Sequence, residues 1–188
     1  MGNLAEKHEF KTELIDGKIY YMSPSASPFH GMIIGNLYLL IGNYLKGKQC
    51  KVFTDTIDVY LNEENRVIPD LSVHCDKNKF TERGYEGIPK LIVEVISPSS
   101  IKRDRIEKKA LYERMQVPHY WLIDPKNKSL EIYNLVDGIY VLEEVYTDYD
   151  ETELTRMSNE DRVKVAIEFK SAAFEDLSIS IADIFSFF

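Results

Sequence analysis

The sequence contains few of the residues that build metal clusters or disulfide frameworks. Its 188 residues include two cysteines, Cys50 and Cys75, and four histidines, with no Cys-x-x-Cys or Cys/His ligand spacing. Two cysteines are too few for a disulfide framework, and they lack the spacing of a structural zinc site. We therefore expect both to be small core residues of a protein in the reducing cytoplasm.

Long apolar runs are also absent. The most apolar stretch, residues 29–45, is interrupted by His30, Asn36, Asn43 and three glycines. It is shorter than the roughly 20 residues that a membrane-spanning helix requires. The first ten residues carry charges of both signs without an apolar core, unlike a signal peptide. The sequence thus predicts a soluble protein without a membrane partner.

The chain lacks a net positive charge. Its formal charge is −8, and from Asp137 onward it has 13 acidic residues against 4 basic ones. This balance argues against a protein that simply coats nucleic acid. One basic cluster stands out, and it is either a phosphate-binding rim or a solvated helix face. Its members are Lys102, Arg103, Arg105, Lys108 and Lys109.

Length and composition indicate one globular domain over residues 1–188. The apolar fraction of 44% and the charged fraction of 29% are ordinary for soluble domains, and the length allows a sizeable core. Neither an internal repeat nor a long linker divides the chain. We therefore treat it as a single folding unit.

A strand–helix–strand pattern organises the middle of the chain. It covers residues 91–96, 102–116 and 120–123. The first run is apolar and rich in β-branched residues, which predicts a strand buried on both faces. Glu94 lies within it, and a buried carboxylate requires a cationic partner. At about 100° per residue, Lys108 shares a helix stripe with Leu111 and Tyr112. Lys108 should therefore point toward the strand that carries Glu94.

The remaining patterns predict further strands, one long helix and several loops. Strands are expected as two short pieces within 13–22, then at 52–61, 66–75, 130–135, 139–146 and 162–169. A helix is expected at 29–46, loops at 23–28, 77–89 and 149–161, and a docked apolar tail at 181–188. A polar turn makes the pair 52–61 and 66–75 an antiparallel hairpin. Pro69 indicates that the second strand lies at an edge or carries a bulge.

Three polar residues occupy positions that packing alone does not require: Asp70, Glu94 and Lys108. Two carboxylates from neighbouring strands suit Mg²⁺ or Mn²⁺. A nearby ammonium can orient or deprotonate an attacking water and offset charge in the transition state. The alternative is a buried ion-pair network that fixes the sheet against the helix.

These motifs resemble the PD-(D/E)XK nucleases and, more specifically, the Uma-two family of restriction-endonuclease-like proteins. The matching pieces are Glu13-Leu-Ile-Asp-Gly17, Met22-Ser-Pro24 with His30, Val67-Ile-Pro-Asp-Leu-Ser72, Leu91-Ile-Val-Glu-Val-Ile-Ser-Pro-Ser99, Arg103-Asp-Arg-Ile-Glu-Lys108, Leu111-Tyr112 and Val117-Pro-His-Tyr-Trp-Leu-Ile-Asp-Pro125. They follow the family order over about residues 13–135. Residues 174–185 also resemble the family's C-terminal segment.

The resemblance implies an α/β (α+β) fold with a restriction-endonuclease-like core, in which helices flank a mixed central sheet with extra β-hairpins. The core would cover about residues 13–135, followed by an acidic extension over 137–188. The resemblance also implies that Asp70, Glu94 and the Val95 carbonyl bind Mg²⁺ or Mn²⁺. It implies DNA as the substrate and a homodimer that brings two sites to two strands.

The chain departs from the general nuclease pattern at one position. That pattern places a lysine two residues after the acid, where this chain has Ile96. In the Uma-two family the lysine comes from the following helix and corresponds to Lys108.

Auxiliary residues surround these three. We interpret Glu13 as a surface residue at a hairpin start and His30 as a structural residue of the long helix, with a contact to the site as the alternative for each. Tyr112 and Asp104, one turn either side of Lys108, are expected to be its partners.

Ser97 and Ser99 have no histidine in a plausible base position, and we interpret them as turn and helix-cap residues. Three functions remain open. The first is a metal-dependent endonuclease acting on DNA, and the second is a binding module with the same fold and no turnover. The third is a regulatory subunit that uses the apolar tail and the acidic C-terminal third.

Overall fold

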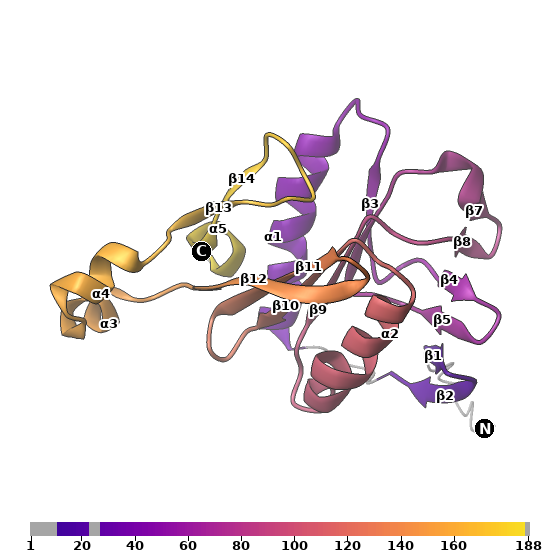
Figure 1. Ribbon diagram of the computed structural model, residues 1–188, viewed down its shortest axis with the longest axis horizontal. Coiled ribbons are helices and arrows are strands. Elements are labelled where there is room, and N and C mark those ends of the chain that lie inside the picture. Colours follow the sequence, from indigo (N-terminus) through magenta and orange to yellow (C-terminus); the bar gives the residue numbers. More distant parts are fainter. Residues whose placement is uncertain (1–10, 23–26, 187–188) are drawn as a thin grey trace, which may run out of the picture.

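The central sheet organises the molecule (Figure 1). The computed structural model describes residues 11–22 and 27–186. The central sheet contains, in spatial order, β12 (Ile139–Thr147), β11 (Ser129–Val136), β10 (His119–Asp124), β9 (Leu91–Val95), β6 (Leu71–His74) and β3 (Lys51–Thr54). β9 and β10 run parallel, whereas the other neighbours run antiparallel. The expected mixed sheet is confirmed.

A second sheet of shorter strands packs beside the first. Its order is β2 (Lys18–Tyr21), β1 (Thr12–Ile15), β5 (Asn65–Val67), β4 (Val59–Asn62), β8 (Gly84–Glu86) and β7 (Phe80–Thr81). β1 and β2 form the expected N-terminal hairpin. A separate two-stranded sheet pairs β13 (Glu168–Lys170) with β14 (Ser178–Ser180).

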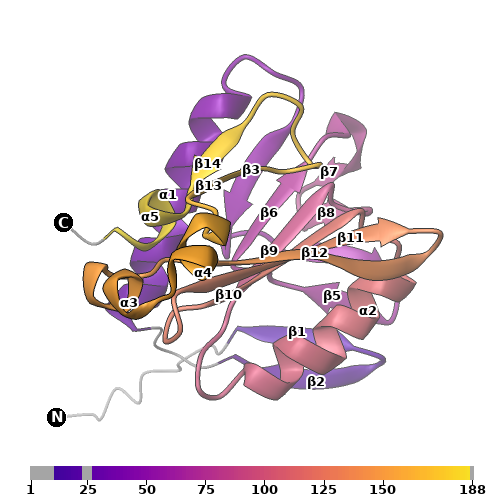
Figure 2. The same ribbon diagram turned by 60° about the vertical axis from the view of Figure 1, so that its left-hand side comes forward.

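Helices cover both faces of the central sheet (Figure 2). α1 (Pro28–Leu45) packs on one face, where its apolar stripe joins the larger core cluster. η2 (Arg103–Lys108) and α2 (Lys109–Arg114) pack on the other face, together with residues of the second sheet. The shorter helices are η1 (Lys77–Lys79), α3 (Glu151–Arg156), α4 (Asn159–Lys164) and α5 (Ile181–Phe185).

Strand β9 is buried on both faces, as expected for a central strand with a parallel neighbour. Leu91, Val93 and Val95 belong to the core cluster that contains α1. Ile92 belongs to the opposite cluster, which contains α2. Because side chains alternate along a strand, Glu94 points to the α2 face. The alternation therefore places Glu94 opposite the helix that carries Lys108.

The expected strands 52–61 and 66–75 are each interrupted and divided between the two sheets. Their first and last parts, β3 and β6, pair in the central sheet, while β4 and β5 form the hairpin in the second sheet. The second interruption contains Pro69, which has no N–H for a ladder hydrogen bond. β6 lies between β9 and β3, so the edge position is wrong. The expected loop 77–89 contains η1 and the short strands β7 and β8.

The acidic segment after β12 contains two helices, contrary to the expected loop at 149–161 and to the first part of the expected strand at 162–169, whose last two residues lie in β13. α3 begins with a capping box of Asp150 and Glu153, and Ser158 caps α4. These local hydrogen bonds start helices where the composition indicated a loop. Neither helix has a buried residue, and both project away from the sheets (Figure 1).

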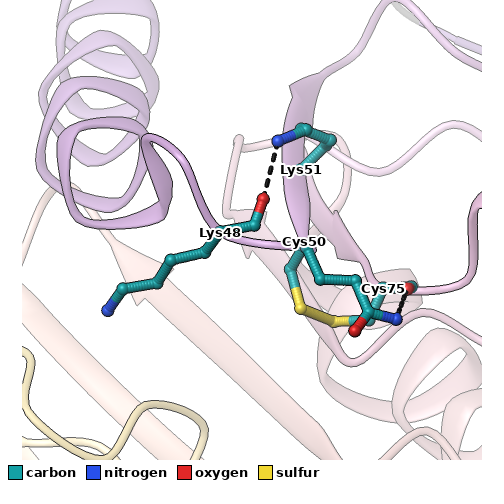
Figure 3. The surroundings of a disulfide bond; sticks show 5 residues. Lys48, Cys50, Lys51 and Cys75 are labelled. Atoms are coloured by element: carbon teal, nitrogen blue, oxygen red, sulfur yellow. Dashed lines mark hydrogen bonds between the residues drawn. A yellow bond between two sulfur atoms is a disulfide. The ribbon is translucent and has the colours of Figure 1, made fainter.

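The two cysteines form a disulfide bond (Figure 3). The expectation of two reduced core cysteines is therefore wrong, and both side chains are only partly buried. The reason is strand register: Lys51 of β3 lies opposite His74 of β6. Cys50 and Cys75 are the next opposed pair beyond these two residues. Their separation of 25 residues in the sequence does not indicate that they lie close together. Gln49 adds a hydrogen bond from its side-chain amide to the Cys75 carbonyl, at 2.7 Å.

The apolar tail docks as expected over its described part. α5 packs against α1, and Asn36 of α1 donates a hydrogen bond to the Ile184 carbonyl at 3.2 Å. Residues 187–188 of that tail, and residues 23–26 of the expected loop before α1, lie outside the described residues. Within the described ranges, 11–22 and 27–186, no helix is long and apolar enough to cross a membrane.

Candidate active site

Lys108 lies between two buried carboxylates that belong to different sheets. Its Nζ is 2.9 Å from Glu94 Oε1 on β9 and 2.8 Å from Glu13 Oε1 on β1. All three side chains are at most 4% exposed. Lys108 thus points at the strand that carries Glu94. Glu13 is not the expected surface residue, because its side chain is 1% exposed. Its carboxylate also accepts a hydrogen bond from the Ile68 main-chain N–H at 3.0 Å.

Tyr112 contacts the Glu94 carboxylate of this cluster. Its hydroxyl donates to Glu94 Oε1 at 2.6 Å, so Tyr112 is a partner of Glu94, whereas we expected it to be a partner of Lys108. Burial, followed by the nearby Glu94 and Glu13 carboxylates, raises the pKa of Tyr112 well above its usual value. The phenol therefore stays protonated and remains a hydrogen-bond donor.

Asp104 is buried beside the same cluster. Burial raises its pKa, although the positive charge of Lys108 acts in the opposite direction. Among the described residues, the ion pairs of Lys108 are with Glu13 and Glu94, and the expected partner Asp104 forms no ion pair with it. The main-chain carbonyl of Asp104 accepts a hydrogen bond from the Tyr120 hydroxyl at 3.0 Å, which anchors this turn of the helix to β10.

Asp70 occupies the break between β5 and β6 and meets two other candidate residues. Its Oδ2 accepts a hydrogen bond from the Val95 main-chain N–H at 2.7 Å and lies 3.3 Å from His30 Nε2. Burial would lower the pKa of His30, but the Asp70 carboxylate and the Val95 main chain outweigh burial and raise it. His30 therefore contacts the site, which we had given only as the alternative to a structural role.

The charges of the cluster perturb one another. Burial raises the pKa of Glu94 well above its ordinary value. Lys108 opposes this shift, and Asp70, Asp104 and Glu13 add to it. Burial alone would lower the pKa of Lys108, but the Glu13, Glu94 and Asp104 carboxylates outweigh it and raise the pKa. Lys108 is therefore an ammonium at neutral pH.

Lys108 ends a π-helical segment, Arg103–Lys108, within the helix expected at 102–116. The expected α-helical spacing is wrong for this segment, yet the inward direction of Lys108 holds, because a separation of four residues is close to one turn in both helix types. Asp104 and Lys108 are the buried residues of the segment. Short π-helical turns inside α-helices are frequent at functional sites.

The donor set suits a hard divalent cation. The contacts described above fall on one oxygen of each carboxylate, Oε1 of Glu94 and Oδ2 of Asp70. Neither Glu94 Oε2 nor Asp70 Oδ1 takes part in these contacts. Across residues 11–22 and 27–186, no three His, Cys, Asp or Glu side chains form a metal-binding group. Mg²⁺ needs no such cage, since it commonly binds through one or two carboxylates, waters and substrate phosphates.

Glu13 is the residue that sequence reasoning misplaced. In β1 the buried positions are Glu13 and Ile15, which alternate with partly exposed neighbours. The period of two therefore puts Glu13 on the apolar face of its strand, a signal that the sequence does contain. Ser97 behaves as interpreted, since its main-chain N–H donates to Ser100 Oγ at 2.9 Å within a turn.

Comparison with known proteins assigns the chain to a family. Residues 2–165 match the model of the Uma2 (Uma-two) family, which is described as "Putative restriction endonuclease". The chain belongs to the Uma2 family. The resemblance inferred from its motifs is thus confirmed over most of the Uma2 chain.

Two similar proteins extend the comparison. An uncharacterised protein of Synechocystis sp. is 32% identical to this Uma2 chain over 134 residues, which cover 70% of the chain and 68% of that protein. The crystal structure of a "putative nuclease" from Anabaena variabilis matches with a TM-score of 0.69, over 93% of this chain and 89% of that one. The identity is 19%, so this likeness shows the fold. The expected fold class is confirmed.

Proposed function

We propose that this Uma2 protein is a metal-dependent endonuclease that hydrolyses DNA phosphodiester bonds. The observation that carries the proposal is the buried Lys108 ammonium, 2.9 Å from Glu94, with Asp70 held by the main-chain N–H of Val95, the next residue of the same strand. A cation beside two carboxylates combines the groups used in metal-assisted phosphodiester hydrolysis. The family description and the fold shared with the Anabaena protein support the same activity.

Asp70, Glu94 and the Val95 carbonyl would hold the Mg²⁺ or Mn²⁺ ion. When bound, the ion would supply Lewis-acid stabilisation and lower the pKa of a bound water. The Val95 N–H bond keeps the Asp70 carboxylate at the end of β9. The Tyr112 hydroxyl and the Lys108 ammonium orient the Glu94 carboxylate, because both donate to the same oxygen.

Lys108 acts as a cation and hydrogen-bond donor. Its raised pKa keeps the proton on Nζ, so this group would orient the attacking water or a phosphate oxygen and offset developing negative charge. Glu13 is a positioning residue, since its carboxylate also holds the Lys108 ammonium, at 2.8 Å. A preorganised cation of this kind requires little rearrangement when charge develops.

One observation favours a second candidate function, a nucleic-acid-binding or regulatory protein without turnover. Glu13 and Glu94 each already form an ion pair with Lys108, and all three side chains are at most 4% exposed. Such a cluster also fits a structural ion-pair network. Binding without cleavage would then be the activity of the fold.

Cleavage of supercoiled plasmid DNA distinguishes the two. We expect nicking that depends on Mg²⁺ or Mn²⁺ and is abolished by EDTA. Lys108→Ala and Glu94→Gln should each lower the rate by about 10²–10³-fold, as for loss of one preorganised electrostatic group. Asp58→Asn is a matched control, because Asp58 is ion-paired to Arg66 at 2.9 Å outside the site. Its rate should equal that of the native protein.

Absence of cleavage by native protein with either metal would exclude the endonuclease and leave the binding protein. Loss of only a few-fold in Lys108→Ala would remove Lys108 from the catalytic role. A homodimer is part of the proposal, because two sites are needed to cut two strands. Sedimentation of the native protein with and without DNA measures it.

A further inference from the structure

Arg103 is a cation near the proposed site that forms no ion pair with a carboxylate of residues 11–22 or 27–186. Its Nε is enclosed by protein and has no hydrogen-bond partner among the described residues. Its guanidinium lies over the ring of Tyr20, with the central carbon 4.8 Å from the ring centroid. Stacking on an aromatic ring is a common way to hold a guanidinium that binds a phosphate.

The other cations of the basic cluster are engaged differently. Arg105 forms ion pairs with Glu131 and, at 3.5 Å, with Asp124. Lys102 approaches Glu107 at 3.9 Å, and Lys108 is held by Glu13 and Glu94. Lys109 lies over the ring of Tyr133 on β11, 4.1 Å from its centroid. The cluster is therefore not a uniform basic rim.

The register of the N-terminal hairpin puts Arg103 on the same side as the site. Tyr20 of β2 lies directly opposite Glu13 of β1. Opposed residues of an antiparallel pair project to the same face, with their Cβ atoms about 5 Å apart. Glu13 uses that face to contact Lys108. Tyr20, and the Arg103 guanidinium above it, therefore flank the Lys108 cluster.

We propose that Arg103 binds a phosphate of the DNA backbone next to the scissile phosphate, with Tyr20 as the platform for its guanidinium. This inference rests on the proposed function, because the ligand is the phosphodiester chain. A guanidinium fork matches two phosphate oxygens, and such a contact positions a strand without reading its sequence. Arg103 and Lys108 would then contact neighbouring parts of one strand.

The test is DNA binding measured without cleavage. Fluorescence anisotropy of a labelled duplex in EDTA gives the dissociation constant at several salt concentrations. Arg103→Gln should weaken binding about tenfold and lower the slope of log K against log salt by about one, the change expected for one lost phosphate contact. Arg103→Lys keeps the charge but lacks the guanidinium fork, so its dissociation constant should lie between those of the native protein and Arg103→Gln. Tyr20→Leu should resemble Arg103→Lys.

Lys109→Gln is the matched control, because Lys109 also lies over a tyrosine ring but on β11, away from the Glu13 hairpin. It should change the dissociation constant less than threefold. Thermal melts of all variants exclude unfolding as the cause. An Arg103→Gln variant with native slope, or with a loss no larger than that of Lys109→Gln, overturns the proposal.

The two proposals fail separately. If the native protein cleaves DNA while Arg103→Gln leaves KM and the salt slope unchanged, the endonuclease stands and the Arg103 contact is wrong. If Arg103→Gln lowers the slope but native protein cuts nothing with any divalent metal, the phosphate contact stands and the endonuclease is wrong. If the native protein binds no duplex at low salt, both are wrong.

Discussion

Glu13 Oε1 lies 2.8 Å from Lys108 Nζ, although one residue belongs to the N-terminal hairpin and the other to the helix after β9. The contact ties the second sheet to the strand–helix–strand unit of the central sheet. Glu94 completes the arrangement from the central sheet itself. Two carboxylates share one ammonium, so removing any member changes both the stability of the fold and the electrostatics of the site.

Loss of the shared cation should be costly. We expect Lys108→Met to lower the free energy of unfolding by about 3–5 kcal/mol, because it leaves two buried carboxylates without the cation that balances their charge. Urea denaturation measures the effect. Lys164→Met provides the comparison, since Lys164 pairs with Glu160 at 3.1 Å on an exposed helix surface, and should cost less than about 1 kcal/mol. Equal costs for the two variants would contradict the role given to the buried cluster.

Glu94 should make native stability fall as pH rises. Its folded-state pKa is raised above the ordinary 4.5. Between the unfolded-state and the folded-state pKa, the native protein therefore binds more protons than the unfolded chain. This contribution is fully present below about pH 4.5 and is lost as pH rises through the folded pKa. In EDTA, Glu94→Gln should remove this slope, as measured by urea midpoints from about pH 5 to about pH 8.

Glu131→Gln is the control for the pH experiment, because Glu131 pairs with the partly exposed Arg105 outside the buried cluster. It should keep the native slope over the same range. Parallel curves for the native protein and Glu94→Gln would show that Glu94 carries no shifted proton.

Metal binding should stabilise the native protein through Asp70. Mn²⁺ at about 100 times its Kd should add about 2.7 kcal/mol, because it binds the folded state. Asp70→Asn keeps a side-chain oxygen for the Val95 N–H but removes a charge from the proposed ligand set. We expect metal-free Asp70→Asn to be as stable as the native protein or more so, without a Mn²⁺ shift in its melting temperature.

Asp58→Asn, at an ion pair away from the site, should retain the Mn²⁺ shift. A large destabilisation by Asp70→Asn, combined with no Mn²⁺ effect on native protein, would favour a structural ion-pair network and end the metal-site assignment.

The Cys50–Cys75 disulfide should stabilise the fold without taking part in the site. It closes a loop of 25 residues, for which loop-closure entropy gives about 3–4 kcal/mol. Reduction, or the double substitution Cys50→Ser with Cys75→Ser, should lower the free energy of unfolding by about that amount in denaturant titrations. Any cleavage activity and its metal dependence should stay native under mild conditions. Identical denaturation with and without reductant would show that the bond does not form in solution.

Local sequence patterns predicted the structure of those segments in which residues close in sequence are also close in space. The strand–helix–strand unit follows from two apolar runs around a helical pattern, and the long helix α1 follows from a period of about 3.6 residues. The inward direction of Lys108 follows from its separation of about one helical turn from its apolar neighbours. A buried Glu94 also requires a cationic partner, and the apolar stripe of the following helix identified Lys108 as that partner. The family motifs added Asp70 and Val95 to that pair as candidate metal ligands.

Only the tertiary structure decided which distant elements complete the site. The burial of Glu13 against Lys108, the approach of His30 to Asp70 and the placement of Arg103 over Tyr20 depend on how two sheets and two helix faces pack together. The interruption around Pro69, the disulfide and the capped helices α3 and α4 likewise departed from the periodic expectation. Periodicity gives the face on which a side chain lies, but the distance between two faces is set by non-local packing and strand register. The sequence alone therefore determined the candidate residues, and the fold determined which of them meet.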